Sequence, residues 1–431
     1  MESTSRASSL ADGASGDRLE RLNALLAEVT RSNAFQRERL GVSRLDELDE
    51  LARLPLTHKD DLLADQAANP PFGTNLTYRL DRYTHLHQTS GTTGATLRVL
   101  ETAEDWQWWT RLLAQVLRAT GIGAGDRVVL AYSFGPYIPF WATYAGVDEL
   151  GAMVIPLGGM DSVQRLQTVR DYQATALACT PSYALHLAQV AQRHGLGDAL
   201  ESVQRIVCTG EPGASLPAVR DRIESEWGAR CFDHAGLTEV GPFGYPCAAA
   251  GGMHLFEDEF VCELLDPHDG QPVAPGAEGE LVITALGRVG FPVIRYATGD
   301  VIDHRADPCP AGHPGRWLPR GILGRTDDMV VIRGMNVFPS AIEQILRESQ
   351  GVGEFRITFY TDPRAMDEIK IEVELSQPLE ARAIQARMRQ RLGLRVRLVP
   401  VRPGILPEQL GKARRVEDLR PRAATTGLRE R

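Results

Sequence analysis

A glycine loop rich in hydroxyl groups is the first segment whose residue types could bind a ligand. It consists of Thr89, Ser90, Gly91, Thr92, Thr93 and Gly94. Glycines let the backbone approach a phosphate closely, while hydroxyls and amides supply hydrogen-bond donors. It is not a Walker loop, because Ala95 and Thr96 follow where Lys and Ser or Thr would stand. The loop therefore indicates phosphate binding of another type, and a plain turn between strands is the alternative interpretation.

Two later segments place a carboxylate at the end of an expected strand. Thr238 and Glu239 follow the strand that ends near Phe232. A hydroxyl beside a carboxylate at that place could hold a phosphate oxygen and Mg²⁺. Asp300 ends the segment that begins at Tyr296, and its carboxylate could accept two hydrogen bonds from a ribose diol. A helix-capping pair and an ordinary Asp turn are the respective alternatives.

Lysine is rare in this chain, which makes each lysine conspicuous. Only three of the 47 basic residues are lysines: Lys59, Lys370 and Lys412. Such a bias is typical of a GC-rich genome rather than of a function. Lys412 stands in the segment 411–415, and a solvated position in a basic tail is the alternative to a role in chemistry.

Two Cys–His pairs have the residue types of a zinc site. Cys247 and His254 lie just after the Thr238–Glu239 segment, and Cys309 and His313 lie further along the chain. Two thiols and two imidazoles suit tetrahedral zinc. The alternative is two buried cysteines and two surface histidines.

The elements that must position these residues follow an α/β pattern. Short β-branched runs predict buried strands, and amphipathic stretches predict helices between or beside them, which is typical of a parallel sheet covered by helices. The expected strands lie at 127–132, 152–156, 175–180, 205–210 and 229–233, and the expected helices at 103–120, 162–172, 183–194 and 216–227. Strands at 259–266 and 280–285, bounded by turn-rich sequence, predict a mixed β subdomain.

A third pattern after residue 323 predicts a compact α+β unit of about 100 residues, within the usual size of a domain. The expected strands lie at 329–332, 355–360, 368–375 and 396–400, and the expected helices at 340–348 and 380–392.

Composition excludes several classes of protein. With 43% hydrophobic and 24% charged residues, the chain is ordinary for a soluble globular protein. Its net charge of -9 argues against a nucleic-acid-binding surface. No apolar run reaches the roughly 18 residues that a membrane helix needs, and the first residues lack the apolar segment of a secretory signal. We therefore expect a cytoplasmic protein with no nucleic acid or membrane partner.

Taken in order, these segments resemble the motifs of the adenylate-forming superfamily of acyl-CoA synthetases, luciferases and peptide-synthetase adenylation domains. The sequences at 253–267, 323–346 and 411–416 resemble the phenylacetate-CoA ligase branch in particular. The resemblance covers about residues 50–420. It implies ATP-dependent activation of a carboxylic acid, here an aryl acid, as an acyl-adenylate, followed by thioester formation with coenzyme A.

The resemblance also implies a division of the chain into domains. A large N-terminal domain that binds ATP and the acid would span 18–326, with mainly parallel sheets covered by helices plus the mixed β subdomain. A small, mobile α+β C-terminal domain would span 327–420 and swing about a hinge at Asp327. Residues 1–17 and 421–431 are expected to be flexible tails.

By the same resemblance, the motif residues receive roles in binding the nucleotide. The loop Thr89–Gly94 would hold the β- and γ-phosphates, Thr238 the α-phosphate, and Glu239 the Mg²⁺ ion. Asp300 and Arg325 would bind the ribose, and Lys412 would bridge the acid and the α-phosphate. The adenine would lie along Gly210, Glu211, Pro212, Asp233, His234, Ala235 and Gly236.

The acid and the thiol receive sites as well. An aromatic wall with small glycines suits a flat aryl acid. The acid pocket would be lined by Tyr132, Phe134, Tyr137, Phe140, Trp141, Gly158, Gly159, Met160, Ser182 and Leu237, although half of these residues packing in the core is the alternative. The thiol would approach along Gly334, Met335 and Asn336.

Three positions depart from the family pattern. Ala235 stands where an aromatic residue usually stacks on adenine, so that either His234 or no residue takes this role. Ala95 replaces a lysine common after the phosphate loop. Ala311 replaces the second cysteine of the CxC pair that some relatives use for a structural zinc, so His313 would have to serve, or the site is lost.

Two other functions stay open. The first is a stand-alone adenylating enzyme that loads a separate acyl carrier protein or an amine. The second is a non-catalytic nucleotide-binding relative, against which the intact Glu239, Asp300, Arg325 and Lys412 argue. The expected partners are a small carboxylic acid and a nucleotide, and a homodimer is also left open.

Overall fold

The structure of the protein, a computed structural model, describes most of the chain. The described residues are 3–89, 96–133, 135–211, 214–267, 269–274, 276–303, 308–313, 315–326, 330–332, 335–337, 339–349, 351–362, 367–375, 380–392, 395–406 and 415–420. Within these ranges, the side chains of residues 3–16, 331, 335–336 and 392 are not described.

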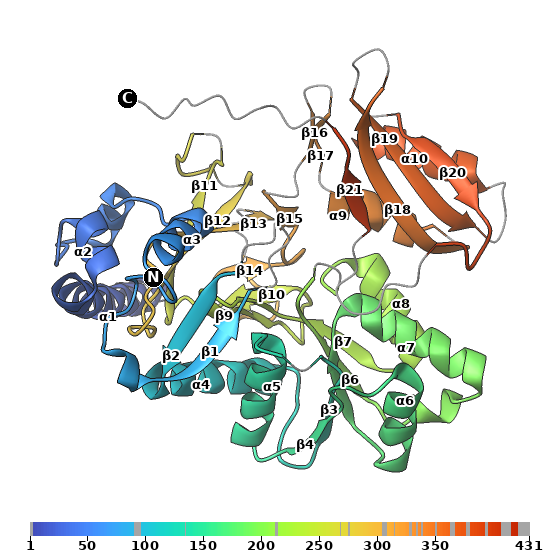
Figure 1. The fold of residues 1–431 in the computed structure, drawn as a ribbon, viewed down its shortest axis with the longest axis horizontal. Coiled ribbons are helices and arrows are strands. Elements are labelled where there is room, and N and C mark those ends of the chain that lie inside the picture. The colour runs from blue at the N-terminus through green and yellow to red at the C-terminus, as the bar shows by residue number, and fades with distance from the viewer. Residues whose placement is uncertain are drawn as a thin grey trace.

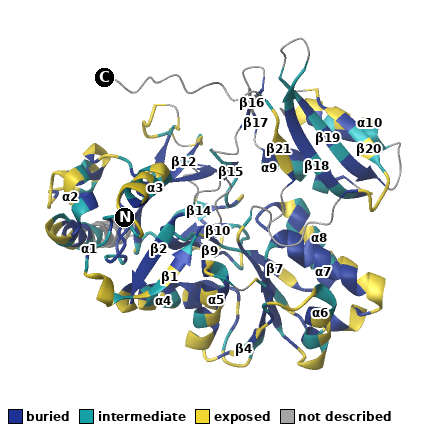
Figure 2. Ribbon diagram, in the orientation of Figure 1, coloured by how far each residue is buried: buried dark blue, intermediate teal, exposed yellow. Residues whose placement is uncertain are grey.

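A five-stranded parallel sheet forms the centre of the larger domain (Figure 1). Its strand order is β4-β3-β5-β6-β7. The bounds are Arg127–Leu130 for β3, Met153–Pro156 for β4, Ala176–Cys179 for β5, Arg205–Cys208 for β6 and Arg230–Asp233 for β7. Strand β5 is buried along its whole length, and buried residues are concentrated at the centre of the larger domain (Figure 2). The predicted parallel sheet is therefore confirmed.

Helices cover both faces of this sheet. The helices are α4 (Ala103–Ala119), α5 (Ile138–Glu149), α6 (Ser162–Asp171), α7 (Pro181–His194) and α8 (Pro217–Trp227), with the short 3₁₀ helix η3 at Gly197–Ala199. On one face, Leu177 and Ile206 pack in an apolar cluster with residues of α6, α7 and α8. On the other face, Val128 and Val207 pack with residues of α4 and α5. This explains why the strands read as continuous apolar runs rather than as alternating ones.

A β-hairpin precedes α4 and frames the expected phosphate loop. Strand β1 (Tyr83–Gln88) pairs antiparallel with β2 (Arg98–Thr102), and His87 lies opposite Val99. Helix α4 begins immediately after β2, because Thr102 and Asp105 form a capping box. The hairpin therefore fixes Gln88 and Arg98, which flank the expected loop, relative to the helix start at its other end.

Two antiparallel sheets confirm the expected mixed β subdomain. The first has the order β14-β10-β9-β8 and the second β11-β12-β13-β15. The first sheet comprises β8 (Ala235–Leu237), β9 (Gly241–Pro246), β10 (Met253–Leu255) and β14 (Trp317–Leu318). The second comprises β11 (Phe260–Leu265), β12 (Glu278–Ala285), β13 (Tyr296–Asp303) and β15 (Gly324–Arg325).

The N-terminal part differs from the sequence expectation. Helix α1 spans Ser3–Ser32, so it begins inside the segment 1–17 that was expected to be a tail. Its second half packs Leu22, Leu26 and Val29 in an apolar cluster, which anchors the helix, because tertiary packing of an apolar face supplies most helical stability in proteins. The remaining elements are α2 (Ala34–Leu40), η1 (Leu48–Arg53), α3 (Lys59–Ala68) and η2 (Leu80–Arg82).

The C-terminal unit confirms the expected α+β pattern. Its sheet has the order β20-β19-β18-β21, and its own apolar core includes Phe355, Ile371 and Ile384. The elements are β16 (Val330–Ile332), β17 (Met335–Val337), α9 (Pro339–Arg347), β18 (Val352–Thr361), β19 (Asp367–Leu375), α10 (Glu380–Leu392), β20 (Arg397–Val401) and β21 (Val416–Asp418). Helix α9 contacts α8 and β15 of the larger domain (Figure 1).

Candidate active site

The carboxyl ends of β5, β6 and β7 gather several of the predicted site residues at one edge of the parallel sheet. Glu211 follows β6, and its Oε1 accepts a hydrogen bond of 2.7 Å from the backbone N–H of Ser182, in the first turn of α7. Asp233 ends β7, and its Oδ2 accepts one of 2.9 Å from the N–H of Ser215. Ligands of such sheets bind outside the carboxyl ends of the strands. This edge is therefore the candidate binding face.

Burial changes the titration of three groups at this edge. It raises the pKa of Glu211, and it raises the pKa of Asp233 to about 6. The same loss of water lowers the pKa of His234 to about 4, so the imidazole is neutral at pH 7. Nδ1 of His234 is buried and has no hydrogen-bond partner in the described structure. A neutral ring with a free nitrogen can hydrogen-bond to a ligand.

Glu239 is a buried carboxylate with 4% of its surface exposed. It lies in the turn at 238–240 between β8 and β9, which we call the central turn. Nζ of Lys59 lies 3.4 Å from its Oε1. Tyr296 hydrogen-bonds to Glu239, and burial together with the Glu239 charge raises the pKa of Tyr296 well above its usual value. Asp300 and Arg325 act electrostatically on the same tyrosine. Three of the predicted site residues therefore act electrostatically on one buried phenol.

Lys59 reaches this place because the segment before it docks on β13. The N–H of Thr57 donates to the carbonyl of Arg295 at 2.8 Å, and its carbonyl accepts from the N–H of Ala297 at 2.9 Å. Helix α3 then begins at Lys59. The sequence marked Lys59 only by its rarity and assigned it no role. The contact with Glu239 is the part of the site that the motifs missed.

The predicted ribose pair is brought together across two strands. Strands β13 and β15 place Asp300 opposite Arg325, and Nη1 of Arg325 lies 3.0 Å from Oδ1 of Asp300. The neighbouring Gly299 has a φ of +76°, and a Cβ there would lie 2.7 Å from Nη2 of Arg325. A glycine is therefore required for the guanidinium to lie over this turn.

Other predicted residues fall at the limits of the described structure. Thr89 is described and closes the base of its loop, since its N–H donates to the carbonyl of Leu97 at 3.1 Å. Gly210 has a φ of +94° directly after β6. Ten further residues that were assigned a role lie outside the described residues: Ser90, Gly91, Thr92, Thr93, Gly94, Phe134, Pro212, Asp327, Gly334 and Lys412. The side chains of Met335 and Asn336 are also not described.

The structure separates the expected acid wall into buried and exposed members. Phe140 is 2% exposed and packs in the apolar cluster beneath the sheet. Tyr132 is half-buried and packs against that cluster. Tyr137, Trp141 and Met160 are each about two-fifths exposed, at 42%, 41% and 40%. Part of the expected acid wall therefore packs in the core, as in the alternative interpretation, whereas Tyr137, Trp141 and Met160 are exposed.

Three of the four predicted zinc ligands converge. The ligand atoms of Cys247, His254 and Cys309 all lie within 4.8 Å of one another, and all three residues are buried. The two sulfur atoms are 3.7 Å apart. Both ring nitrogens of His254 lack a hydrogen-bond partner in the described structure. The fourth candidate, His313, is exposed, with its ring centroid 5.5 Å from that of His254.

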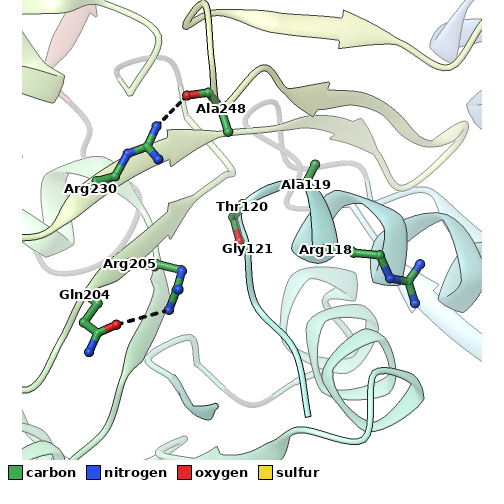
Figure 3. A pocket seen from close by; sticks show the side chains of 8 residues that line it. All are labelled: Arg118, Ala119, Thr120, Gly121, Gln204, Arg205, Arg230 and Ala248. Carbon is green, nitrogen blue, oxygen red and sulfur yellow. Dashed lines mark hydrogen bonds between the residues drawn. The ribbon is translucent and has the colours of Figure 1, made fainter. Parts of the chain in front are cut away.

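A separate cavity lies away from the candidate binding face at the carboxyl ends of the parallel strands. It measures about 400 Å³ and is lined by Arg118, Ala119, Thr120, Gly121, Gln204, Arg205, Arg230 and Ala248 (Figure 3). Arg205 and Arg230 begin β6 and β7, so the cavity lies at the amino ends of the strands. The candidate site lies at their carboxyl ends, and the two are on opposite edges of the sheet.

Comparisons with known proteins agree with this arrangement. Residues 83–289 match the family model of the AMP-binding enzymes, and residues 334–420 match that of the AMP-binding enzyme C-terminal domain. The chain is 34% identical to a phenylacetate-coenzyme A ligase of Escherichia coli over 87% of this chain and 86% of the relative. It is 30% identical to one of Thermus thermophilus over 93% and 95%. The chain belongs to the adenylate-forming AMP-binding enzymes, in the phenylacetate-coenzyme A ligase family.

A 2-hydroxyisobutyryl-CoA ligase has been solved in several states, and two of its structures are compared with this chain. The postadenylation state, in complex with an acyl-AMP, has a TM-score of 0.86 and 32% identity, covering 93% of this chain and 88% of that one. The thioesterification state has a TM-score of 0.71 and 33% identity, covering 95% and 90%. The domains of this chain are therefore arranged as in the postadenylation state of that ligase.

Replacing Lys59 with Met should lower the free energy of unfolding by about 1–3 kcal/mol, the usual cost of leaving a buried polar group uncompensated. The reason is that Glu239 is buried and would lose its nearby ammonium. Urea unfolding at pH 7 measures the loss.

Lys370→Met is the matched control. Nζ of Lys370 lies 3.3 Å from Oε2 of Glu372, but Arg356 holds that oxygen as well, at 2.7 Å. The control should therefore lose less stability than Lys59→Met. Equal losses in the two variants would contradict the role given to Lys59.

Proposed function

We propose that this protein activates a carboxylic acid with ATP and then transfers the acyl group to the thiol of coenzyme A. The observation that supports this most is the cluster around Tyr296, where the central turn at Glu239 meets Asp300 and Arg325. In a chain of this family, these residues would bring a phosphate-binding turn and a ribose-binding pair close to each other.

The nucleotide would lie between this cluster and the carboxyl ends of the parallel strands. The loop Thr89–Gly94 would receive the β- and γ-phosphates, Thr238 the α-phosphate, and Asp300 with Arg325 the ribose. Adenine would lie near the end of β7, where the neutral ring of His234 offers a free nitrogen. Ala235 is 7% exposed and offers no aromatic face, so we assign the contact with adenine to His234.

The chemistry of Glu239 agrees with its expected role as a Mg²⁺ ligand. Its carboxylate is an oxygen donor of the kind that Mg²⁺ prefers, and it already attracts the ammonium of Lys59 in this structure. A bound Mg²⁺ would neutralise charge on the phosphates during the displacement. Lys59 would remain beside the carboxylate, because the docking of Thr57 on β13 holds the start of α3 there.

The reaction has two steps whose atoms balance. A carboxylate oxygen attacks the α-phosphorus, and pyrophosphate leaves. The thiol then attacks the acyl carbon, the carbon–oxygen bond to the phosphate breaks, and AMP leaves. Catalysis of the first step is mainly positioning and charge neutralisation. Lys412 would neutralise charge in that step, and rotation at Asp327 would then bring Gly334, Met335 and Asn336 to the thiol.

We propose an aryl acid as the substrate class. Tyr137 and Trp141 keep exposed aromatic rings beside the carboxyl end of β3, and aromatic faces suit a flat ring. The phenylacetate-coenzyme A ligases support this choice. The structure of the 2-hydroxyisobutyryl-CoA ligase has a TM-score of 0.86 to this chain, and that ligase activates 2-hydroxyisobutyrate, a small branched acid. Small branched acids are therefore the competing substrate class.

Pyrophosphate exchange into ATP tests both the activity and the acid class. We expect exchange with phenylacetate and benzoate, and at least about 10-fold lower kcat/KM with 2-hydroxyisobutyrate, because its small branched group leaves an aryl pocket partly empty. A preference for 2-hydroxyisobutyrate would contradict the aryl assignment. An absence of exchange with every acid, in folded protein that binds ATP, would contradict the activity itself. Offering coenzyme A and acyl carrier proteins to the activated acid then identifies the acceptor.

A structural zinc at Cys247, His254 and Cys309 is a second part of the proposal. Two thiolates on one tetrahedral zinc, with Zn–S bonds of about 2.3 Å, lie about 3.8 Å apart, which matches the 3.7 Å between these sulfur atoms. A buried histidine without partners for either nitrogen is also explained by a metal. His313 would complete the site by a small movement of its exposed ring. The metal would hold β9, β10 and the segment before β14 together.

Metal analysis of the purified protein should find about one zinc per chain, since binding of a structural zinc is coupled to folding of its site. Cys247→Ala should lose the metal and lower the Tm. Cys262→Ala is the control, because this cysteine lies on β11 and outside the three-residue group. Well under one equivalent of metal in the wild type, with a Tm that a chelator does not change, would contradict the zinc assignment.

A further inference from the structure

A buried chain of polar side chains connects the hairpin of the phosphate loop to the central turn. We infer that His87, Glu101 and Arg288 form a positioning bridge that fixes Thr238 and Glu239 relative to β1 and β2, the two strands that flank the expected phosphate loop. This inference rests on the proposed function, because it assigns the bridge to the same site. None of the motifs contains these three residues.

The geometry of the bridge is continuous. Nδ1 of His87 lies 2.9 Å from Oε2 of Glu101, and it must donate its proton, because an ionised carboxylate only accepts. The other oxygen, Oε1, accepts from Nη2 of Arg288 at 2.9 Å. Nη1 of Arg288 then donates to the backbone carbonyl of Thr238, also at 2.9 Å. The chain ends on the peptide that joins Thr238 to Glu239.

All three side chains are withdrawn from water. Glu101 and Arg288 are 0% exposed, and His87 is 3% exposed. Removing such charges from water is costly, and apolar residues of similar volume are often as stable or more stable at such positions. Stability alone therefore explains the bridge poorly, whereas a requirement for a fixed distance between two segments explains it well.

The hairpin side of the bridge is rigid. His87 lies on β1 and Glu101 on β2, and residue 89 closes the loop base with Leu97. The turn after Arg288 is held to the start of α4, because Oδ1 of Asp105 accepts from the N–H groups of residues 289 and 290 at 3.0 and 3.2 Å. A displacement of Glu101 or Arg288 would therefore move the central turn relative to the hairpin of β1 and β2.

The two ends of the bridge hold different parts of the triphosphate in the proposed site. The loop would hold the β- and γ-phosphates, which leave as pyrophosphate, while Thr238 would hold the α-phosphate, which stays. In-line displacement requires both parts at once, and a misplacement of about 1 Å can cost about 100-fold in rate. Once pyrophosphate has left, only the Thr238 end still has a phosphate. The bridge should therefore matter mainly in the first half-reaction.

The test compares the two half-reactions in Glu101→Gln and Arg288→Met. We expect kcat for pyrophosphate exchange to fall by about 10–100-fold, as misplacement of reacting groups predicts. Capture of added acyl-adenylate by coenzyme A should stay within about 3-fold, since the loop has no role in it. The ratio of the two rates is the readout, because partial unfolding lowers both rates by the same factor.

Asp126→Asn is the control for a damaged, partly buried carboxylate outside the bridge. Asp126 accepts from the N–H of Gly123 at 2.9 Å and from the hydroxyl of Thr175 at 2.7 Å, and it pairs with Arg205 at 3.3 Å, next to the opposite edge of the sheet. This variant should lose stability and keep the wild-type ratio. An unchanged ratio in Glu101→Gln and Arg288→Met, with an active wild type, would overturn the inference alone. An inactive wild type would overturn the proposed function instead.

Discussion

The charge of Glu239 must be compensated in a place that water hardly reaches, and much of the site follows from this constraint. A buried carboxylate needs an opposite charge or several hydrogen-bond donors. Lys59 supplies the charge because Thr57 docks on β13, and Tyr296 supplies a hydroxyl from the same strand. These contacts tie the N-terminal segment, the central turn and the second antiparallel sheet to one point. The same point is where a metal-bound phosphate would need both carboxylate and cation.

The parts of the site that the sequence predicted are those with local signals. The alternation of strands and helices predicted the parallel sheet, and therefore the edge at which Asp233 lies. Asp300 and Arg325 were expected to share a ligand, and they face each other on paired strands. Four residues were expected to converge from their residue types, and three of them, Cys247, His254 and Cys309, do so, whereas His313 is exposed. In each case, the side-chain chemistry itself restricted the choice of partner.

The parts that the sequence could not predict depend on contacts between distant segments. Arg288 and Glu101 are 187 positions apart, and nothing in their local sequences marks them as a pair. The same holds for Lys59 and Glu239. Phe140 and Trp141 are adjacent aromatic residues, yet one is core and the other rim, because only the helix phase of α5 decides between them. The flexible tail predicted at 1–17 differs from the structure for a similar reason. The packing of Leu22 and Leu26 anchors a helix that extends back to Ser3.

In the proposed reaction, a carboxylate oxygen of the substrate becomes bonded to the α-phosphorus of ATP. Oxygen-18 labelling tests this bond directly, with both carboxylate oxygens of the acid labelled and the products analysed by mass spectrometry. The proposed chemistry predicts one labelled oxygen in each AMP, because the bridging oxygen leaves with AMP when the thiol attacks the acyl carbon. Unlabelled AMP, or label in inorganic phosphate together with ADP, would contradict it.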